Sequence, residues 1–405
     1  MVDETADFGS LYCKLSLRID KHLPGYVDAY FGPGRLKAEV NKEGKKPISG
    51  LMEDAEKLRR HAPTGDKVRE TFLQKQLESI LTTLKRLNGE EIPYREEVLR
   101  LFDIRIAKIS EAELQKSRER LSDIFGTSDL RMKLRRWRRE RYVRRKLIEP
   151  ALRVLARELA GRSRKLLGTK KLGTCVFRLV KNKPWSGYNW YLGKLRSRVE
   201  INVDKPIEIT NLPKLVAHEA YPGHHTEHAL KEEILYRGRG YLESSIFLIN
   251  APETTISEGI AENALEFVFE REEDALRWMY NRAASKFDAS RDASIVKALE
   301  ELREGRVNAA IMLHAENRSG RDVIAYLTDV LLEDYGLAKR TLNFLKNPLF
   351  RSYIFCYTAG RKMIADVLKQ KNPNDRQRII QKLYTTQICP SNLEAVTSTL
   401  SSSTP

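Results

Sequence analysis

Long apolar runs are absent from this sequence, and no stretch approaches the roughly 18 consecutive apolar residues that a membrane-spanning helix needs. The N-terminus, residues 1–5, contains two acidic residues and lacks both the basic start and the apolar segment of a signal peptide. We therefore expect a protein with no membrane span and with a cytoplasmic location.

Cysteine is also scarce, because the 405 residues include four, namely Cys13, Cys175, Cys356 and Cys389. They lie far apart and form no C-x-x-C pair, and a chain of this length buries enough apolar surface to fold without disulfides. No residue beside them in the sequence would activate a thiol. The sequence predicts four reduced, buried, structural cysteines rather than a metal ligand or a nucleophile.

What the chain does contain is 41% hydrophobic and 31% charged residues, which excludes disordered and fibrous proteins. We divide it into residues 1–173, a helical region that ends in a basic helical segment, and residues 174–405, which hold the histidine motif described below. We expect the two regions to form one continuous fold.

The excess of positive charge is local. The whole chain has a net charge of +17, and residues 131–171 contain seventeen Lys or Arg and three Glu, which gives +14. Apolar residues recur there at roughly helical spacing, with Pro150 as a kink or as the start of a second helix. One interpretation of this basic segment is a binding site for nucleic acid or for an acidic surface of another molecule, with Trp137 and Tyr142 available to stack on bases. The other interpretation is a solvated helix face whose arginines pair with acidic helices of the same protein. We favour the solvated face, because no recognisable nucleic-acid module accompanies the charge.

Periodic apolar positions predict helices over residues 51–61, 68–87, 96–104 and 111–125, through the basic segment, and again from residue 212 to the end. Strand-like alternation occurs only at residues 174–180 and 199–203, with an aromatic loop over 185–190 between them. The predicted fold class is mainly α, with one small central β-sheet or hairpin.

Four of the seven histidines fall within eleven residues, at 218, 224, 225 and 228. His218 is followed by Glu219, as at the start of the H-E-x-x-H motif, in which a histidine binds zinc and the adjacent glutamate is the general base. The spacing then departs from that motif, because Pro222 stands where the second histidine would be.

A straight helix would place His224 about 240° around the axis from His218, which is poor geometry for one ion. Pro222 cannot continue the helix, however, and Gly223 tolerates almost any backbone conformation, so a local bulge can bring His224 back beside His218. His225 is the alternative, since a regular helix would return it to the same face roughly 10.5 Å away.

The best candidate for a third protein ligand is Glu258, on a segment of strong helical character. Two histidines from one helix and a glutamate from another leave the fourth zinc position free for water. The competing interpretation is a surface stripe of Glu258, Glu262, Glu266 and Glu270, although like charges four residues apart repel and call for a neutralising ion or base. Glu262 either orients a ligand histidine or is solvated.

At residues 218–225, His-Glu-Ala-Tyr-Pro-Gly-His-His, the sequence resembles a largely uncharacterised family of bacterial and archaeal proteins with an HE-x-x-PGH motif, often labelled lipoproteins or zinc-peptidase-like proteins. These proteins look like distant relatives of gluzincin metallopeptidases. Weaker similarities extend over most of the chain, at residues 24–33, 258–261, 312–315 and 357–360. The sequence departs from the family at several positions, including Ile260 in place of Trp and Glu227 in place of Gln, which bears on substrate preference more than on the metal site.

The resemblance implies a gluzincin-like helical metallohydrolase with one Zn²⁺ per chain on His218, His224 and Glu258, and it favours His224 over His225. It also implies Glu219 as the base that takes a proton from water and returns it to the leaving amine. Tyr357 and His314 are candidate donors to the oxyanion that forms.

The resulting hypothesis is a zinc-dependent hydrolase, a metallopeptidase of carboxypeptidase-like or other specificity, with a peptide or another amide as substrate. The alternative is a non-catalytic protein that binds nucleic acid or an acidic surface through residues 131–171. A third interpretation, a purely structural metal, would require four protein ligands. The sequence leaves the native metal and the oligomeric state undetermined.

Overall fold

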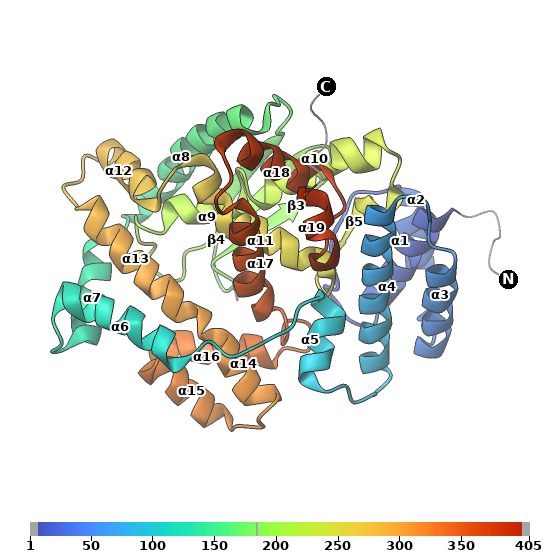
Figure 1. Cartoon of the computed structure of the whole chain (residues 1–405), viewed down its shortest axis with the longest axis horizontal. Helices are drawn as coiled ribbons and strands as arrows, with labels where there is room; N and C mark the ends of the chain where they lie inside the picture. The colour runs from blue at the N-terminus through green and yellow to red at the C-terminus, as the bar shows by residue number, and fades with distance from the viewer. Residues whose placement is uncertain (1–6, 184, 399–405) are drawn as a thin grey trace.

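The computed structural model describes residues 7–183 and 185–398, and within them helices dominate (Figure 1). The first half contains α1 (Phe8–Asp20), α2 (Gly34–Lys42), α3 (Ile48–Arg60), α4 (Lys67–Leu87), α5 (Tyr94–Phe102), α6 (Glu111–Phe125), α7 (Leu130–Glu140) and α8 (Arg145–Leu167). The second half contains α9 (Leu212–Glu219), α10 (His224–Lys231), a π-helix (Glu232–Gly238), a 3₁₀ turn (Leu242–Ser245), α11 (Pro252–Val268), α12 (Glu272–Arg282), α13 (Ala289–Glu304), α14 (Arg306–His314), α15 (Gly320–Asp329), α16 (Tyr335–Lys346), α17 (Ile354–Leu368), α18 (Pro373–Thr385) and α19 (Pro390–Ser398). The prediction of a mainly helical fold is confirmed.

The described strands form two small sheets. In the larger one, β4 (Arg196–Asn202) lies in the middle, parallel to β2 (Thr174–Val180) and antiparallel to β3 (Gly187–Tyr191). In the smaller one, β1 (Val27–Tyr30) pairs antiparallel with β5 (Ile246–Leu248). The expectation of one sheet was therefore incomplete. Strands β1 and β5 are short and lie more than 200 residues apart in the sequence, so neither shows a local pattern that predicts a strand.

One further expectation about local structure was wrong, and so was one of the two alternatives for Pro150, the start of a second helix. The segment predicted as an aromatic loop contains β3, whose Gly187 and Asn189 interrupt any apolar and polar alternation. Pro150 neither restarts a helix nor ends one, because α8 continues through it from residue 145 to residue 167. Pro150 is the sixth residue of α8, so its missing N–H removes a single intrahelical hydrogen bond, to the carbonyl of Lys146, and the helix continues past it.

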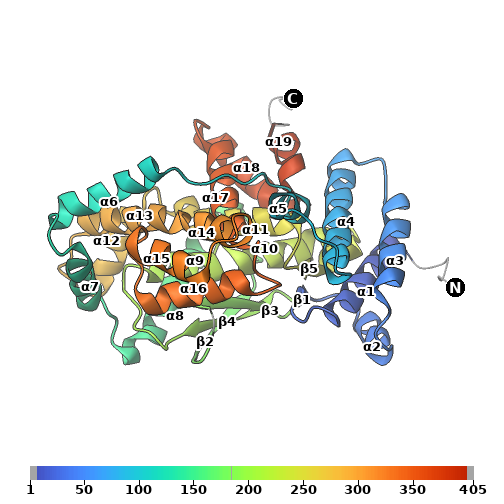
Figure 2. The same cartoon turned by 90° about the horizontal axis from the view of Figure 1, so that it is seen from below.

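The helix α11 runs through the middle of the molecule, where α9 and α17 pack against it (Figures 1 and 2). Its contact with α17 is unusually close, since a Cβ atom on Gly259 would lie 2.5 Å from the carbonyl oxygen of Gly360. A Cβ atom on Gly360 would in turn lie 2.1 Å from the carbonyl oxygen of Thr255. Only glycine fits at both positions, and the crossing brings Glu258 of α11 beside the first turns of α17.

One large hydrophobic core contains side chains from both sides of the predicted division at residue 173, including Leu155 of α8 and Val216 of α9. Among the described residues, no helix is long and apolar enough to span a membrane.

We expect the four thiols to react slowly in the folded protein. Cys13, Cys356 and Cys389 are buried, Cys175 is half-buried, and none forms a disulfide. Burial raises the pKa of Cys13 and of Cys389 to about 12, so the reactive thiolate accumulates only as the pH approaches that range. At pH 8, an aromatic disulfide reagent should label the native protein over hours and the urea-unfolded protein at once. Rapid labelling of the native protein would show that these sites open readily.

Candidate metal centre

Two histidines meet where α9 ends and α10 begins. α9 carries His218 in its last turn and ends at Glu219, and α10 begins at His224. Between them the chain folds back so tightly that a Cβ atom on Gly223 would lie 1.9 Å from the carbonyl oxygen of His218, which only glycine permits. As a result, the imidazole rings of His218 and His224 lie with their centroids 4.8 Å apart.

Glu258 of α11 completes a cluster with these two histidines. Its Oε2 atom lies 3.5 Å from His218 Nε2, and its Oε1 atom lies 3.6 Å from His224 Nε2. One ligand atom from each of the three residues falls within 4.8 Å of the other two. Donors around a tetrahedral zinc ion at about 2.0–2.1 Å are separated by roughly 3.3 Å, so only small side-chain movements would be needed to fit this ion.

The polar atoms of the cluster support a cation as its occupant. Glu258 Oε2 is buried and has no hydrogen-bond partner among the described residues. Burial raises the pKa of Glu258 and lowers the pKa of His218 and of His224, so it favours imidazoles with a free lone pair and disfavours a Glu258 carboxylate that has no cation beside it. Two neutral imidazoles and one carboxylate form the His₂Glu donor set of catalytic zinc sites.

Each ligand candidate is held by a further side chain. On the far side of the His218 ring, Nδ1 lies 3.5 Å from Glu262 Oε1, and Glu262 pairs with Lys214 at 3.1 Å. Burial opposes ionisation of Glu262, but the nearby charge of Lys214 outweighs it, and the pKa of Glu262 is lowered to about 2. The hydroxyl of Tyr353 donates a hydrogen bond to Glu258 Oε1. Such outer contacts fix the ring and carboxylate orientations on which metal affinity depends.

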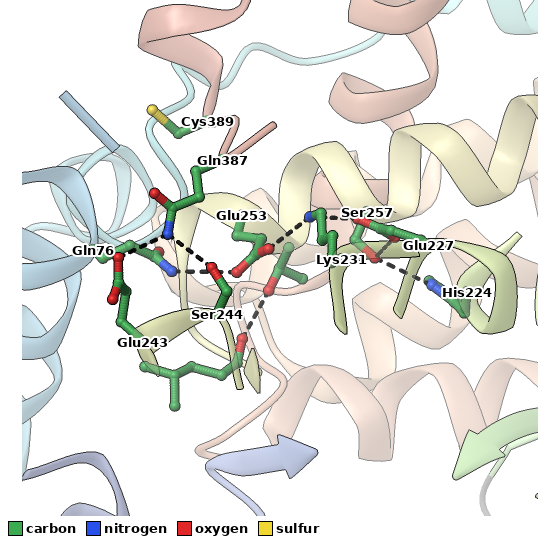
Figure 3. A network of polar contacts seen from close by, with 12 residues as sticks. Gln76, His224, Glu227, Lys231, Glu243, Ser244, Glu253, Ser257, Gln387 and Cys389 are labelled. Atoms are coloured by element: carbon green, nitrogen blue, oxygen red, sulfur yellow. Dashed lines mark hydrogen bonds and ion pairs between the residues drawn. The ribbon is translucent and has the colours of Figure 1, made fainter. Parts of the chain in front are cut away.

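His224 is held by a longer buried chain of polar groups (Figure 3). Its Nδ1 atom lies 3.2 Å from Ser257 Oγ, and the Ser257 hydroxyl donates to Glu227. Glu227 accepts a hydrogen bond from Lys231 at 2.8 Å, and the same ammonium group donates to Glu253 at 2.6 Å. Glu227 occupies a position where the resembled family often has Gln, and Lys231 neutralises the extra charge.

Glu219 lies against strand β3. A Cβ atom on Gly187 would lie 3.0 Å from Glu219 Oε1, so this glycine makes room for the carboxylate. Asn189 donates a hydrogen bond to the Glu219 backbone carbonyl. Burial, and next the nearby charge of Asp28, raise the pKa of Glu219 to about 8, which suits a group that exchanges protons near neutral pH.

Sequence reasoning missed Asp28, Tyr188 and Tyr353. Asp28 lies on β1, is hydrogen-bonded by the Tyr188 hydroxyl, and has its pKa raised by burial to about 6. The only signal for Asp28 was its place within residues 24–33, one of the segments that resemble the family. Tyr353 had no signal, because it stands in an apolar run whose orientation depends on the crossing of α17 with α11.

The two predicted oxyanion donors lie in different surroundings. The ring of Tyr357 lies 5.5 Å, between centroids, from that of Tyr353, which hydrogen-bonds Glu258, and burial and then the charge of Glu258 raise the pKa of Tyr357. The structure does not bring His314 to the cluster. His314 Nε2 lies 2.7 Å from the Leu345 carbonyl oxygen, and its ring packs on Tyr94. Contacts of this kind are typical of a structural histidine in the core.

The remaining histidines of the motif also have contacts elsewhere. His225 Nδ1 lies 2.8 Å from Ser197 Oγ, and its Nε2 lies 2.7 Å from the Leu172 carbonyl oxygen, so both ring nitrogens are already engaged. His228 packs edge-on against the ring of Phe247. Of the two alternatives from the sequence, the structure therefore places His224 beside His218.

No family model matches the chain, and no curated protein matches it. Two solved structures are similar in fold. One is a putative lipoprotein from Colwellia psychrerythraea, with a TM-score of 0.53 and 12% identity. The match covers 86% of this chain and 66% of that one, so this chain spans slightly less than two thirds of that protein. The other is a putative lipoprotein of unknown function from Shewanella oneidensis, with a TM-score of 0.50 and 14% identity over 87% of this chain and 71% of that one. At these identities the likeness concerns the fold alone.

Proposed function

We propose that this protein is a zinc-dependent hydrolase that cleaves peptide or other amide bonds at the cluster of His218, His224 and Glu258, with a gluzincin-like arrangement. The observation that carries the proposal is the convergence of the three ligand atoms within 4.8 Å of one another, with Glu219 adjacent in the chain. Three protein ligands leave a position open, as catalytic rather than structural zinc sites do.

The chemistry divides between the metal and the side chains around it. A zinc ion bound here would lower the pKa of a water molecule and polarise a carbonyl group. Glu219 takes a proton from the attacking water onto its carboxylate and then delivers it to the leaving nitrogen. Tyr357 is the candidate donor to the oxyanion, and Asp28 and Tyr188 set the electrostatic environment of Glu219.

The surroundings favour an extended, partly apolar substrate. Within the described residues, β3 pairs only with β4, so it is an edge strand beside Glu219 and offers backbone groups to an extended peptide. Trp185, Tyr188 and Trp190 form an aromatic cluster on and just before this strand, with ring centroids 4.7–6.2 Å apart. Such rings bind apolar side chains well.

The first test is the metal content of the purified protein. We expect about one zinc per chain, measured by plasma mass spectrometry, and a loss of nearly all of it in His224→Ala and Glu258→Ala. His225→Ala and His314→Ala serve as matched controls, because each removes an imidazole whose hydrogen bonds lie outside the cluster. Circular dichroism identifies any variant that fails to fold.

The proposal fails if the folded wild-type protein takes up no stoichiometric metal after dialysis against zinc. It also fails if His224→Ala and Glu258→Ala retain as much zinc as the two controls, since the ion would then lie elsewhere.

A further inference from the structure

The basic segment forms one exposed helical face that the proposed hydrolase chemistry does not use. Helix α8 has 23 residues and is about 34 Å long, and it lies at the edge of the molecule (Figure 1). Its inner face, which includes Leu152, Leu155 and Leu159, is buried, and the helix packs on α9 and α18. Its outer face is open to solvent in the described structure.

Basic residues line this outer face at helical spacing. Arg153, Arg157 and Arg164 follow one another at intervals of four and seven residues, so they lie on one side of the helix. Among the described residues, no carboxylate lies within 4.0 Å of the charged groups of Lys146, Arg157, Arg164 and Lys165. The two glutamates of α8 lie at the flanks of the face, where Glu149 pairs with Arg153 and Glu158 with Arg162.

Two exposed aliphatic side chains border this basic face. Leu147 is 49% exposed and Val154 is 40% exposed, and their spacing of seven residues aligns them along one edge of the exposed face that carries the arginines. Burial of these two aliphatic side chains in an apolar phase would be favourable, and the neighbouring arginines attract negative charge. Their presence points to a partner that is both anionic and apolar.

The structure weakens the case for nucleic acid as that partner. Of the two rings that the sequence offered for stacking on bases, Trp137 is 3% exposed and donates a hydrogen bond to Asp292, whereas Tyr142 is 39% exposed but lies before the start of α8. Arg141 is buried on the same carboxylate. On the outer face of α8 the exposed apolar groups are aliphatic, whereas single-stranded nucleic acid binds through aromatic stacking.

We propose that the outer face of α8 binds the surface of a membrane that contains anionic phospholipids. The arginines lie at the level of the headgroup phosphates, and Leu147 and Val154 insert between the headgroups, as in helices that lie in the plane of the membrane interface. This contact leaves the inner face of α8, and hence its packing on α9, unchanged.

The test is co-sedimentation with vesicles of phosphatidylcholine alone and with vesicles in which phosphatidylglycerol replaces part of it. We expect binding to the anionic vesicles only. The triple variant Arg153→Gln, Arg157→Gln, Arg164→Gln should weaken it about 100-fold. The double variant Leu147→Ser, Val154→Ser, which keeps every charge, should weaken it about tenfold.

Two control variants match these changes elsewhere on the surface. Lys362→Gln, Lys369→Gln, Lys371→Gln removes the same charge from exposed positions in and just after α17, and Leu192→Ser removes an aliphatic side chain that is 56% exposed. Both should bind anionic vesicles as the wild type does. All substituted side chains are at least partly exposed, so circular dichroism should show intact folds.

Three results would overturn the proposal. The first is that the wild-type protein does not bind anionic vesicles. The second is that the control charge variant and the α8 charge variant lose vesicle affinity equally. The third is that the Leu147→Ser, Val154→Ser variant binds anionic vesicles as tightly as the wild type. Tighter binding to a single-stranded RNA that displaces the vesicles would assign the face to nucleic acid instead. The metal-site variant Glu258→Ala should bind vesicles normally, so this test is independent of the proposed hydrolase activity.

Discussion

Glu219→Gln should lower the rate of amide hydrolysis by about 10²–10⁴-fold while the protein keeps its zinc and its fold. The substitution preserves the size of the side chain against Gly187, but an amide cannot accept the proton of the attacking water. Mass-spectrometric analysis of a peptide library, incubated with zinc-loaded wild type or variant, would measure the rate and reveal whether cleavage is terminal or internal.

Glu233→Gln is the matched control for this experiment. Glu233 undergoes the same chemical change on the π-helix, where its carboxylate pairs with the exposed Lys171. We expect wild-type activity and wild-type zinc content from this variant. Full activity in Glu219→Gln would remove Glu219 from the reaction, whereas equal activity losses in both variants would indicate a general loss of folded enzyme.

The pattern of residue types was enough to predict which residues form the centre of the candidate site, because they are concentrated in a short segment. His218, Glu219 and His224 lie within seven residues, and Pro222 with Gly223 marks the break that brings the two histidines together. The third candidate ligand, Glu258, is a weaker case, because a stripe of glutamates four residues apart is also typical of a surface helix. Its burial follows from the position of α11 within the fold, which no local pattern encodes.

The parts that could not be predicted depend on contacts between distant segments. Asp28 lies near Glu219 because β1 contacts β3, where Tyr188 donates to the Asp28 carboxylate, and Tyr353 reaches Glu258 because Gly259 and Gly360 let two helices touch. The prediction for His314 rested on sequence resemblance, and the structure gives that ring another partner. Periodicity identifies the helices themselves, but the faces they present to one another are set by packing.

Lys231→Met should lower the free energy of unfolding by about 3–5 kcal/mol. Lys231 is 4% exposed, and its ammonium group is the cation between Glu227 and Glu253. Methionine fills a similar volume, so the main effect is electrostatic: two carboxylates are left in a buried site without a counter-charge. Urea denaturation monitored by circular dichroism would measure the change. The control variant Lys171→Met, which breaks an exposed ion pair with Glu233, should change the free energy of unfolding by less than about 1 kcal/mol.

The pH dependence of this loss separates an electrostatic cause from a packing defect. Burial raises the pKa of Glu253 even though Lys231 opposes the shift, and removal of Lys231 would raise that pKa further. The folded variant then binds more protons than the unfolded chain between the two pKa values, so its stability rises as the pH falls. We expect the difference between wild type and variant to be smaller at pH 5 than at pH 8. Adding Glu227→Gln and Glu253→Gln should restore much of the stability, whereas a cavity left by the lysine would persist at every pH and in the triple variant.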